Sequence, residues 1–213
     1  MSRSFHCQRC GKVFTFHGED EIILEKMKRK ILAVFDGCAG TKSATQAFAD
    51  RGHLVETLDI EGDHTFVMDI RDFHIDEHFD FMWFSPECKE FSKANYRLGP
   101  CKDRHPDMSI VEACFRIIDE CKPMHWIVEN PQACLKHFIG KPTITVKYSD
   151  YGYICQKPTD LWGVFPWFWS NVEKNNNTVA FRKRLPCHNI NKAKIPYELS
   201  KSICISIENT LGD

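Results

Sequence analysis

Short apolar runs alternate with amphipathic segments along most of the chain. A continuous apolar run at residues 31–35 is followed by a segment with helical spacing at residues 43–51, which Gly52 closes. Further apolar runs that fit buried strands lie at residues 54–59, 65–68, 79–84 and 125–128. Buried strands that alternate with helices predict a parallel sheet with right-handed crossovers, that is, an open α/β fold.

The clearest helix of this pattern spans residues 110–120. Its apolar side chains at Val111, Cys114, Phe115 and Ile118 recur at helical spacing and share one face. We expect this helix to be one of the crossovers that join the strands.

The residues before the first strand form a separate unit. Residues 18–30 are charged, and their apolar side chains recur at helical spacing, which predicts a short amphipathic linker helix. We therefore divide the chain into an appendage with its linker at residues 1–29 and an α/β domain at residues 30–213.

The composition is that of a soluble globular protein. The chain has 213 residues, of which 43% are hydrophobic and 27% charged, which fits one domain with a proper core. No apolar run approaches the roughly 20 residues of a membrane span, and the first residues lack the apolar core of a secretory signal. We therefore expect an intracellular protein, cytoplasmic or nucleoid-associated, with no membrane partner. The net charge of −1 excludes a bulk electrostatic nucleic-acid binder, so any such contact must come from local patches.

The chain contains 11 cysteines, an odd number. Because no secretory signal precedes them, a disulfide scaffold is not expected, and reduced thiols are the better interpretation. Cys114, Cys134 and Cys204 lie in apolar stretches and are expected to act as small core residues.

Ligands of an open α/β sheet bind at the carboxyl ends of its strands, so the residues after each apolar run are candidates for function. Gly37 and Gly40 follow the first run, where they allow a sharp turn and a close approach to a ligand. Asp59 follows the second run, and it either binds ribose hydroxyls or is a solvated strand-end residue. The later runs are followed by Asp69-Ile70, by residues 85–92 and by Glu129-Asn130-Pro131.

Cys88 stands out chemically among these residues. It lies in the loop after a buried strand with Lys89 beside it, a setting in which a thiol of low pKa acts as a nucleophile. A structural cysteine is the alternative. Glu129, at the end of the next strand, can face Cys88 across the same rim, so a thiol and a carboxyl would share one nucleoside-binding crevice.

Four segments carry recognisable motifs. Residues 35–40 read Phe-Asp-Gly-Cys-Ala-Gly, residues 86–92 Pro-Glu-Cys-Lys-Glu-Phe-Ser, residues 129–131 Glu-Asn-Pro and residues 195–199 Ile-Pro-Tyr-Glu-Leu. In this order they resemble the cofactor loop, the nucleophile loop, the Glu-Asn-Pro signature and the C-terminal helix start of the cytosine-C5 DNA methyltransferases, particularly the short phage-like branch. The resemblance covers about residues 30–207 and implies a Rossmann-like, S-adenosylmethionine-dependent methyltransferase fold.

The resemblance also implies a site and a reaction. S-adenosylmethionine is expected against Phe35, Gly37 and Gly40, with its ribose on Asp59, its adenine between Ile60 and Ile70, and its adenine amino group on Asp69. Cys88 is expected to add to C6 of a flipped cytosine, while Glu129 holds the N3 and amine edge of the base. Further substrate contacts are expected from Ser85, Pro86, Asn130 and Lys157.

The chain departs from the family pattern at several positions. The second glycine of the cofactor loop is Ala39, and the proline before the nucleophile is Glu87, a negative charge beside a thiol that must ionise. Lys89 replaces the usual glutamine after the cysteine and can compensate for that charge. The Gln-x-Arg-x-Arg motif has no clean match, and Lys157 is the candidate cation in its place.

Residues 158–194 stand where the family has a separate target-recognition domain, and only 35 residues separate Thr159 from Ile195. This segment contains Trp162, Trp167, Phe168 and Trp169, followed by Arg182-Lys183-Arg184. Aromatic and cationic residues together suit stacking on unpaired bases and clamping of phosphates, with Arg182 and Arg184 as the substrate contacts. The alternative is that the tryptophans cover the sheet edge and the basic triplet is a solvated face. In either case, sequence specificity is expected to be short, slack or supplied by a partner.

Cys7 and Cys10 have the spacing of the opening half of a zinc finger. A structural zinc site needs four ligands, and His17 or Cys187-His188 are candidates for the remainder. The alternative is a decayed finger with two free thiols.

Three functions remain open on the sequence alone. The first is a DNA cytosine-C5 methyltransferase, acting on a duplex or a single strand. The second is an RNA cytosine methyltransferase, and the third is a degenerate module that binds cofactor or nucleic acid without turnover.

Overall fold

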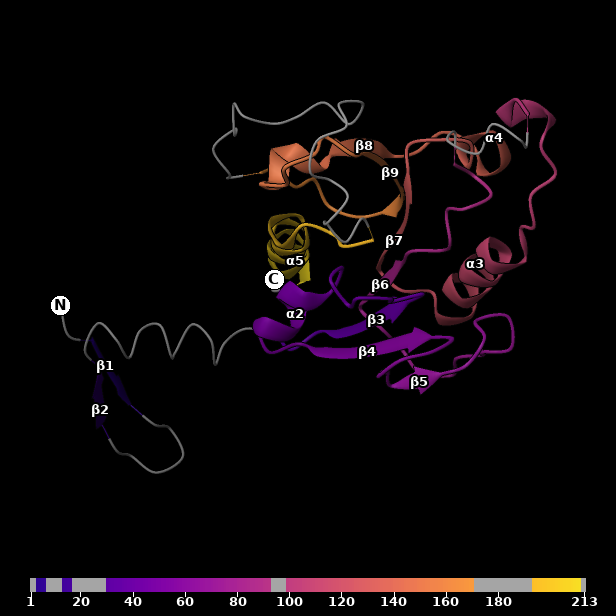
Figure 1. Cartoon of the computed structure of the whole chain (residues 1–213). Coiled ribbons are helices and arrows are strands. Elements are labelled where there is room, and N and C mark those ends of the chain that lie inside the picture. The colour runs from indigo at the N-terminus through magenta and orange to yellow at the C-terminus, as the bar shows by residue number, and fades with distance from the viewer. Residues whose placement is uncertain (1–2, 7–12, 17–29, 93–98, 171–192, 212–213) are drawn as a thin grey trace.

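The computed structural model describes residues 3–6, 13–16, 30–92, 99–170 and 193–211. Its main feature is a seven-stranded sheet with the order β5-β4-β3-β6-β7-β9-β8 (Figure 1). The strands of this sheet are β3 (Ala33–Gly37), β4 (Leu54–Asp59), β5 (Phe66–Val67), β6 (Phe81–Phe84), β7 (His125–Pro131), β8 (Ile144–Lys147) and β9 (Pro158–Val164).

Within this sheet only β9 runs against the other strands. The pairs from β5 through β4, β3 and β6 to β7 are all parallel, whereas β9 is antiparallel to both of its neighbours, β7 and β8. Counted along the chain, the five consecutive parallel strands have the spatial order 3-2-1-4-5, as in a doubly wound Rossmann sheet. The predicted α/β fold is therefore confirmed. Its strand order reverses between β3 and β6, where a ligand crevice is expected.

Side chains alternate between two apolar cores on the two faces of the sheet. Val34 and Trp83 lie in one core, whereas Phe35 and Met82 lie in the other. Because both faces are covered, the central strands are continuous apolar runs in the sequence.

Helices cover both faces (Figure 1). The helices α2 (Gln46–Asp50) and α5 (Tyr197–Leu211) contribute to the first core, and α3 (Ser109–Cys121) contributes to the second. The remaining helical elements are α4 (Lys136–Ile139) and two 3-10 helices, η2 (Cys101–Asp103) and η3 (Tyr148–Tyr151). No helix in these described ranges is both long enough and apolar enough to cross a membrane.

The elements differ from the sequence prediction mainly at their ends. The helix α2 is shorter than residues 43–51, because the residues before Gln46 form turns of the loop that follows β3. In α3 the buried face is formed by Val111, Ala113, Cys114, Ile117 and Ile118. Phe115 is only half-buried, at the border of this face.

A separate two-stranded hairpin lies in the appendage. Its strands β1 (Arg3–His6) and β2 (Val13–Phe16) are antiparallel, with Arg3 opposite Phe16 and His6 opposite Val13. Cys7, Cys10, His17 and the expected linker helix all lie outside the described residues, and so do Arg182, Arg184, Cys187 and His188. The zinc site and the basic triplet therefore stay predictions.

The expectation that the cysteines are reduced is wrong for Cys134. Its sulfur is bonded to that of Cys101, with 5.1 Å between the two Cα atoms. The residues are 33 positions apart, and the fold brings them together in a way that spacing alone does not reveal. Cys114 and Cys204 are buried and are not part of a disulfide, as expected.

Candidate active site

A cavity of about 760 Å³ lies at the carboxyl ends of β3, β6 and β7. It therefore occupies the switch point of the sheet, where the fold predicts a ligand. The cavity brings together Gly40, Ser85, Pro86, Cys88, Glu129, Asn130 and Lys157, all of them predicted site residues. Its other lining residues are Cys38, Ala39, Thr41, Ser43, Ala44, Glu87, Ser92, Pro131, Gln132, Ala133, Pro158, Ala193 and Ile195.

The loop after β3 forms one wall of this cavity. Gly40 has a φ of +48°, in the left-handed region that favours glycine. Its amide donates to Oδ2 of Asp59 at 2.8 Å, and the amide of Ala39 donates to the carbonyl of Leu58 at 3.1 Å. Asp59 at the end of β4 thus holds the loop with one carboxylate oxygen.

Phe35 and Gly37 support this loop from beneath and do not line the cavity. The Phe35 ring is fully buried and stacks on Phe73 with 5.5 Å between centroids. A Cβ at Gly37 would lie 2.5 Å from the ring of Phe84, so this glycine is required by packing. The resemblance assigned both residues to the cofactor, and that assignment stays a prediction.

A second hollow, of about 700 Å³, lies on the Asp59 side of the same loop. Gly40 and Thr41 line both hollows, so the two meet at the loop after β3. The other lining residues of the second hollow are Lys42, Asp59, Glu61, Gly62, Asp63 and His64.

The residues expected around adenine are dispersed. Ile60 is 65% exposed just beyond β4, whereas Ile70 is 5% exposed and belongs to the core. Asp69 accepts hydrogen bonds from the side chain and backbone of Arg71, which lower the pKa of its carboxyl to about 2. Val67 pairs with Asp59, so the next residues, Met68 and Ile60, are level with each other just beyond the two strands. Met68, which is 38% exposed, therefore lies nearer to Ile60 in register than Ile70 does. No motif identifies Met68 in the sequence.

Cys88 lines the cavity, but its thiol is not of low pKa. Burial raises the pKa of Cys88, the negative charge of Glu129 raises it further, and Lys157 opposes both. The expectation from Lys89 is therefore wrong: Lys89 is not among the groups that shift the pKa of Cys88, and burial together with Glu129 outweighs the effect of Lys157.

Glu129 is buried at the end of β7 and is held by hydroxyl groups. The hydroxyl of Tyr148 donates to its Oε1 at 3.1 Å, and a hydrogen bond with Ser85 also reaches the carboxyl. Ser85 in turn accepts the indole N–H of Trp83 at 2.9 Å. Burial raises the pKa of Glu129, while Lys157, Tyr148 and Ser85 act in the opposite direction.

Two further contacts close the site. Asn130 donates its side-chain amide to the carbonyl of Pro86 at 3.0 Å, which ties the end of β7 to the loop that contains Cys88. The amide of Ile195 donates to Oγ of Ser43 at 2.8 Å, so the start of the C-terminal helix packs on the loop after β3.

The aromatic residues of segment 158–194 divide into two groups. Residues 158–164 form β9, and Trp162 is buried there with its indole N–H on the carbonyl of Gly140 at 2.9 Å. Phe168 is also buried, whereas Trp167 and Trp169 are 66% and 69% exposed. Stacking on unpaired bases is thus open to these last two side chains.

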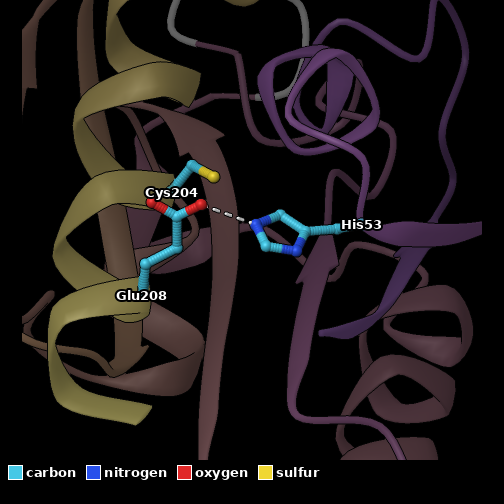
Figure 2. Close-up of side chains that lie close together, drawn as sticks. All are labelled: His53, Cys204 and Glu208. Carbon is cyan, nitrogen blue, oxygen red and sulfur yellow. Dashed lines mark hydrogen bonds and ion pairs between the residues drawn. The ribbon is translucent and has the colours of Figure 1, made fainter. Parts of the chain in front are cut away.

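A cluster away from the cavity has the composition of a metal site. His53, Cys204 and Glu208 place ligand atoms within 4.8 Å of one another, with Cys204 and Glu208 on α5 (Figure 2). The amide of Leu32, however, donates to Nδ1 of His53 at 3.2 Å, so the ring proton sits on Nε2 and points at Oε1 of Glu208, 2.9 Å away.

Arg51 adds a second argument against a metal at this cluster. Its Nε donates to Oε1 of Glu208 at 3.0 Å and its Nη2 to Oε2 at 2.5 Å. A cation would have to displace this guanidinium and remove the proton from His53. We assign the cluster to the attachment of α5 instead.

Comparisons with known proteins find similarity among solved structures. No protein-family model matches the chain, and no curated protein matches it. A solved structure from E. coli is similar. It is a prophage-encoded protein provisionally described as a DNA modification methyltransferase, with 18% identity and a TM-score of 0.46. The alignment covers 62% of this chain and 46% of that one, less than half of the other protein's length. The functional proposal therefore rests on the side chains at the cavity.

Proposed function

We propose that the protein is an S-adenosylmethionine-dependent methyltransferase that acts on C5 of cytosine in DNA. One observation carries this proposal: the Cys88 thiol and the Glu129 carboxyl share one cavity at the switch point of the sheet. The resemblance of the four motifs supports the choice of substrate. A cysteine without a carboxyl beside it would support neither the reaction nor the substrate.

The residues at the cavity have the chemistry that the reaction requires. Cytosine C5 is a poor nucleophile until a thiolate adds to C6, which forms an S–C6 bond and makes C5 enamine-like. Glu129 holds a proton at N3 of the base while the addition to C6 pushes electron density onto the ring. After C5 has gained a methyl group and lost its proton to a base, the S–C6 bond breaks and the Cys88 thiolate is restored.

The loop after β3 fits the cofactor that this reaction needs. S-adenosylmethionine supplies an electrophilic methyl group when bound. Gly40 and Thr41 lie between the two hollows, so an extended ligand can cross the loop with one end near Asp59 and the other near Cys88. Asp59 keeps one oxygen on Gly40 and one on the amide of Ile60, and the ribose contact is the role proposed for it.

Transfer of label from tritiated S-adenosylmethionine to mixed-sequence DNA tests the proposal. Label is expected at cytosine C5 with the wild-type protein and is lost in Cys88→Ser. The matched control is Cys121→Ser, since Cys121 is a free cysteine of α3 that does not line the cavity. Active wild-type protein that leaves C5 unlabelled would contradict the proposal.

Covalent trapping of the protein on DNA distinguishes an active enzyme from a degenerate binding module. DNA that contains 5-fluorocytosine is expected to form a covalent complex with the wild-type protein, because the fluorine cannot leave as a cation. The complex should be absent in Cys88→Ser and present in Cys121→Ser. Binding of cofactor and DNA without a covalent complex would favour the degenerate module.

An RNA cytosine methyltransferase is the second candidate, and the exposure of Trp167 and Trp169 favours it. Exposed aromatic faces suit unpaired bases, which RNA offers more readily than duplex DNA. A panel of duplex DNA, single-stranded DNA and transfer RNA decides between the two substrates.

A further inference from the structure

The hydroxyl of Tyr148 lies on the carboxyl of Glu129, although no sequence motif includes this tyrosine. The Oη–Oε1 distance is 3.1 Å, Tyr148 is fully buried and Glu129 is 6% exposed. Because burial and Glu129 hold the pKa of Tyr148 well above its ordinary value, the phenol remains a neutral donor.

The ring of Tyr148 is itself held in place. The ammonium group of Lys157 lies 4.5 Å from its centroid, and the ring of Tyr153 packs against it edge-on at 5.8 Å. The direction of the hydroxyl is therefore set by its neighbours. The groups that act on the pKa of Glu129 come from different segments: Tyr148 from η3, Lys157 before β9 and Ser85 after β6. The titratable thiol of Cys88 also faces Glu129, whose negative charge raises the pKa of that thiol.

We propose that Tyr148 is a positioning residue whose hydroxyl, together with Ser85, fixes the carboxyl of Glu129 in the orientation that meets the base. This inference rests on the proposed function, since it assigns Tyr148 a role in that reaction. A carboxyl with one donor removed can rotate about its last side-chain bond. The Tyr148 hydroxyl, which approaches from outside the cavity, prevents this rotation without occupying the space that the base needs.

The substitution Tyr148→Phe removes only the hydroxyl and retains the ring under Lys157. The turnover number is expected to fall roughly 10- to 100-fold, the loss typical of one hydrogen bond to a charged group. The KM values for DNA and cofactor should change little. Because a donor to the carboxylate is lost, the limb of the pH–rate profile governed by Glu129 should move to higher pH.

Tyr151→Phe is the matched control. Tyr151 belongs to the same 3-10 helix and is also buried, but its ring lies against Phe168, with 6.4 Å between centroids. This variant should keep the wild-type turnover number and pH profile. Unfolding temperatures of both variants show whether any loss of activity comes from a loss of folded protein.

The pKa of Glu129 can be measured directly by an NMR titration of the glutamate carboxyl carbons, with its signal assigned from Glu129→Gln. This measurement distinguishes the positioning role of Tyr148 from the proposed methyl transfer. The pKa of Glu129 should be higher in Tyr148→Phe than in the wild type and unchanged in Tyr151→Phe. Wild-type turnover and an unmoved pH limb in Tyr148→Phe overturn the positioning role while the proposed function stands. A wild-type protein that transfers no methyl group overturns the proposed function and the catalytic use of Tyr148 together, even if the titration shifts as expected.

Discussion

At the scale of single residues, Cys88 and Glu129 place opposing demands on one cavity. In the proposed reaction, the thiol must lose its proton to attack the base, whereas the carboxyl must deliver a proton to N3. Burial raises the pKa of both groups, which suits Glu129 and hinders Cys88. Lys157 acts on both in the opposite direction and is the one cation among the described residues that line the cavity.

Replacing Lys157 with glutamine should therefore make Cys88 less reactive. Loss of the positive charge raises the pKa of the thiol further, so alkylation of Cys88 at a fixed pH should slow roughly 3- to 10-fold. Iodoacetamide labelling, followed by mass analysis of the peptide that contains Cys88, measures this rate. Lys89→Gln is the control, because Lys89 is the neighbour in sequence but is not among the groups that shift Cys88. Equal slowing in both variants would remove the special role of Lys157.

Asp36 is a second buried acid, beneath the loop after β3. It is completely buried, accepts the Thr45 hydroxyl at 2.7 Å on Oδ2, and has no described partner for Oδ1. Burial, opposed by the Thr45 hydrogen bond, raises the pKa of this carboxyl to about 7, and the negative charge of Asp59 adds to the rise. The folded protein therefore holds a proton there that the unfolded chain releases.

Asp36 should make the protein less stable as the pH rises. A carboxyl whose folded pKa is raised contributes its full stability below the unfolded pKa of 3.8, and loses it as the pH rises towards about 7. Asp36→Asn should remove this dependence, so that above neutral pH the variant is more stable than the wild type by about 1–4 kcal/mol. Urea unfolding of both proteins across this pH range measures the difference. Parallel pH curves for the two would show that Asp36 keeps an ordinary pKa.

At the scale of elements, the Cys101–Cys134 disulfide joins the segment after the Cys88 loop to the segment after β7, the strand that carries Glu129. Cys101 lies in η2, downstream of the nucleophile loop, and Cys134 lies just beyond β7. The amide of Cys134 also donates to the carbonyl of Phe91 at 3.0 Å. Arg104 donates to the carbonyls of Gly99, Glu90 and Ser92, so the base of the nucleophile loop is held from several directions.

Replacing both Cys101 and Cys134 with alanine should lower the free energy of unfolding by roughly 2–4 kcal/mol, because the unfolded chain gains freedom over a long loop. Denaturant unfolding without a reducing agent measures the loss. The control is Cys121→Ala, since Cys121 is a free, half-buried cysteine of α3. An unchanged unfolding midpoint in the double variant would show that the disulfide adds no stability.

At the scale of the whole molecule, the sequence predicted the strands that are covered on both faces and the loops at their ends. Continuous apolar runs reveal such strands directly, and Cys88 and Glu129 follow two of them. The strands β8 and β9 escaped prediction for different reasons. The strand β8 is a partly exposed edge strand, whereas β9 is an inner strand whose buried residues include the polar Thr159 and Asp160, so neither is a continuous apolar run. Tyr148 and Cys101 escaped for a different reason. Their partners, Glu129 and Cys134, are distant in sequence, and only the folded chain brings them together.

The appendage offers the last test of how the molecule is organised. The seven-stranded sheet is complete within residues 33–164, so cofactor binding should not depend on residues 1–29. A segment this short cannot bury a core of its own, and zinc on Cys7 and Cys10 would supply the missing stability. We expect about one equivalent of zinc in protein never exposed to chelator.

The Cys7→Ser/Cys10→Ser variant should lose this zinc and become more susceptible to proteolysis within residues 1–29, while its affinity for the cofactor stays within about twofold of wild type. Metal analysis with less than roughly a tenth of an equivalent would contradict the zinc site and leave the proposed methyl transfer untouched.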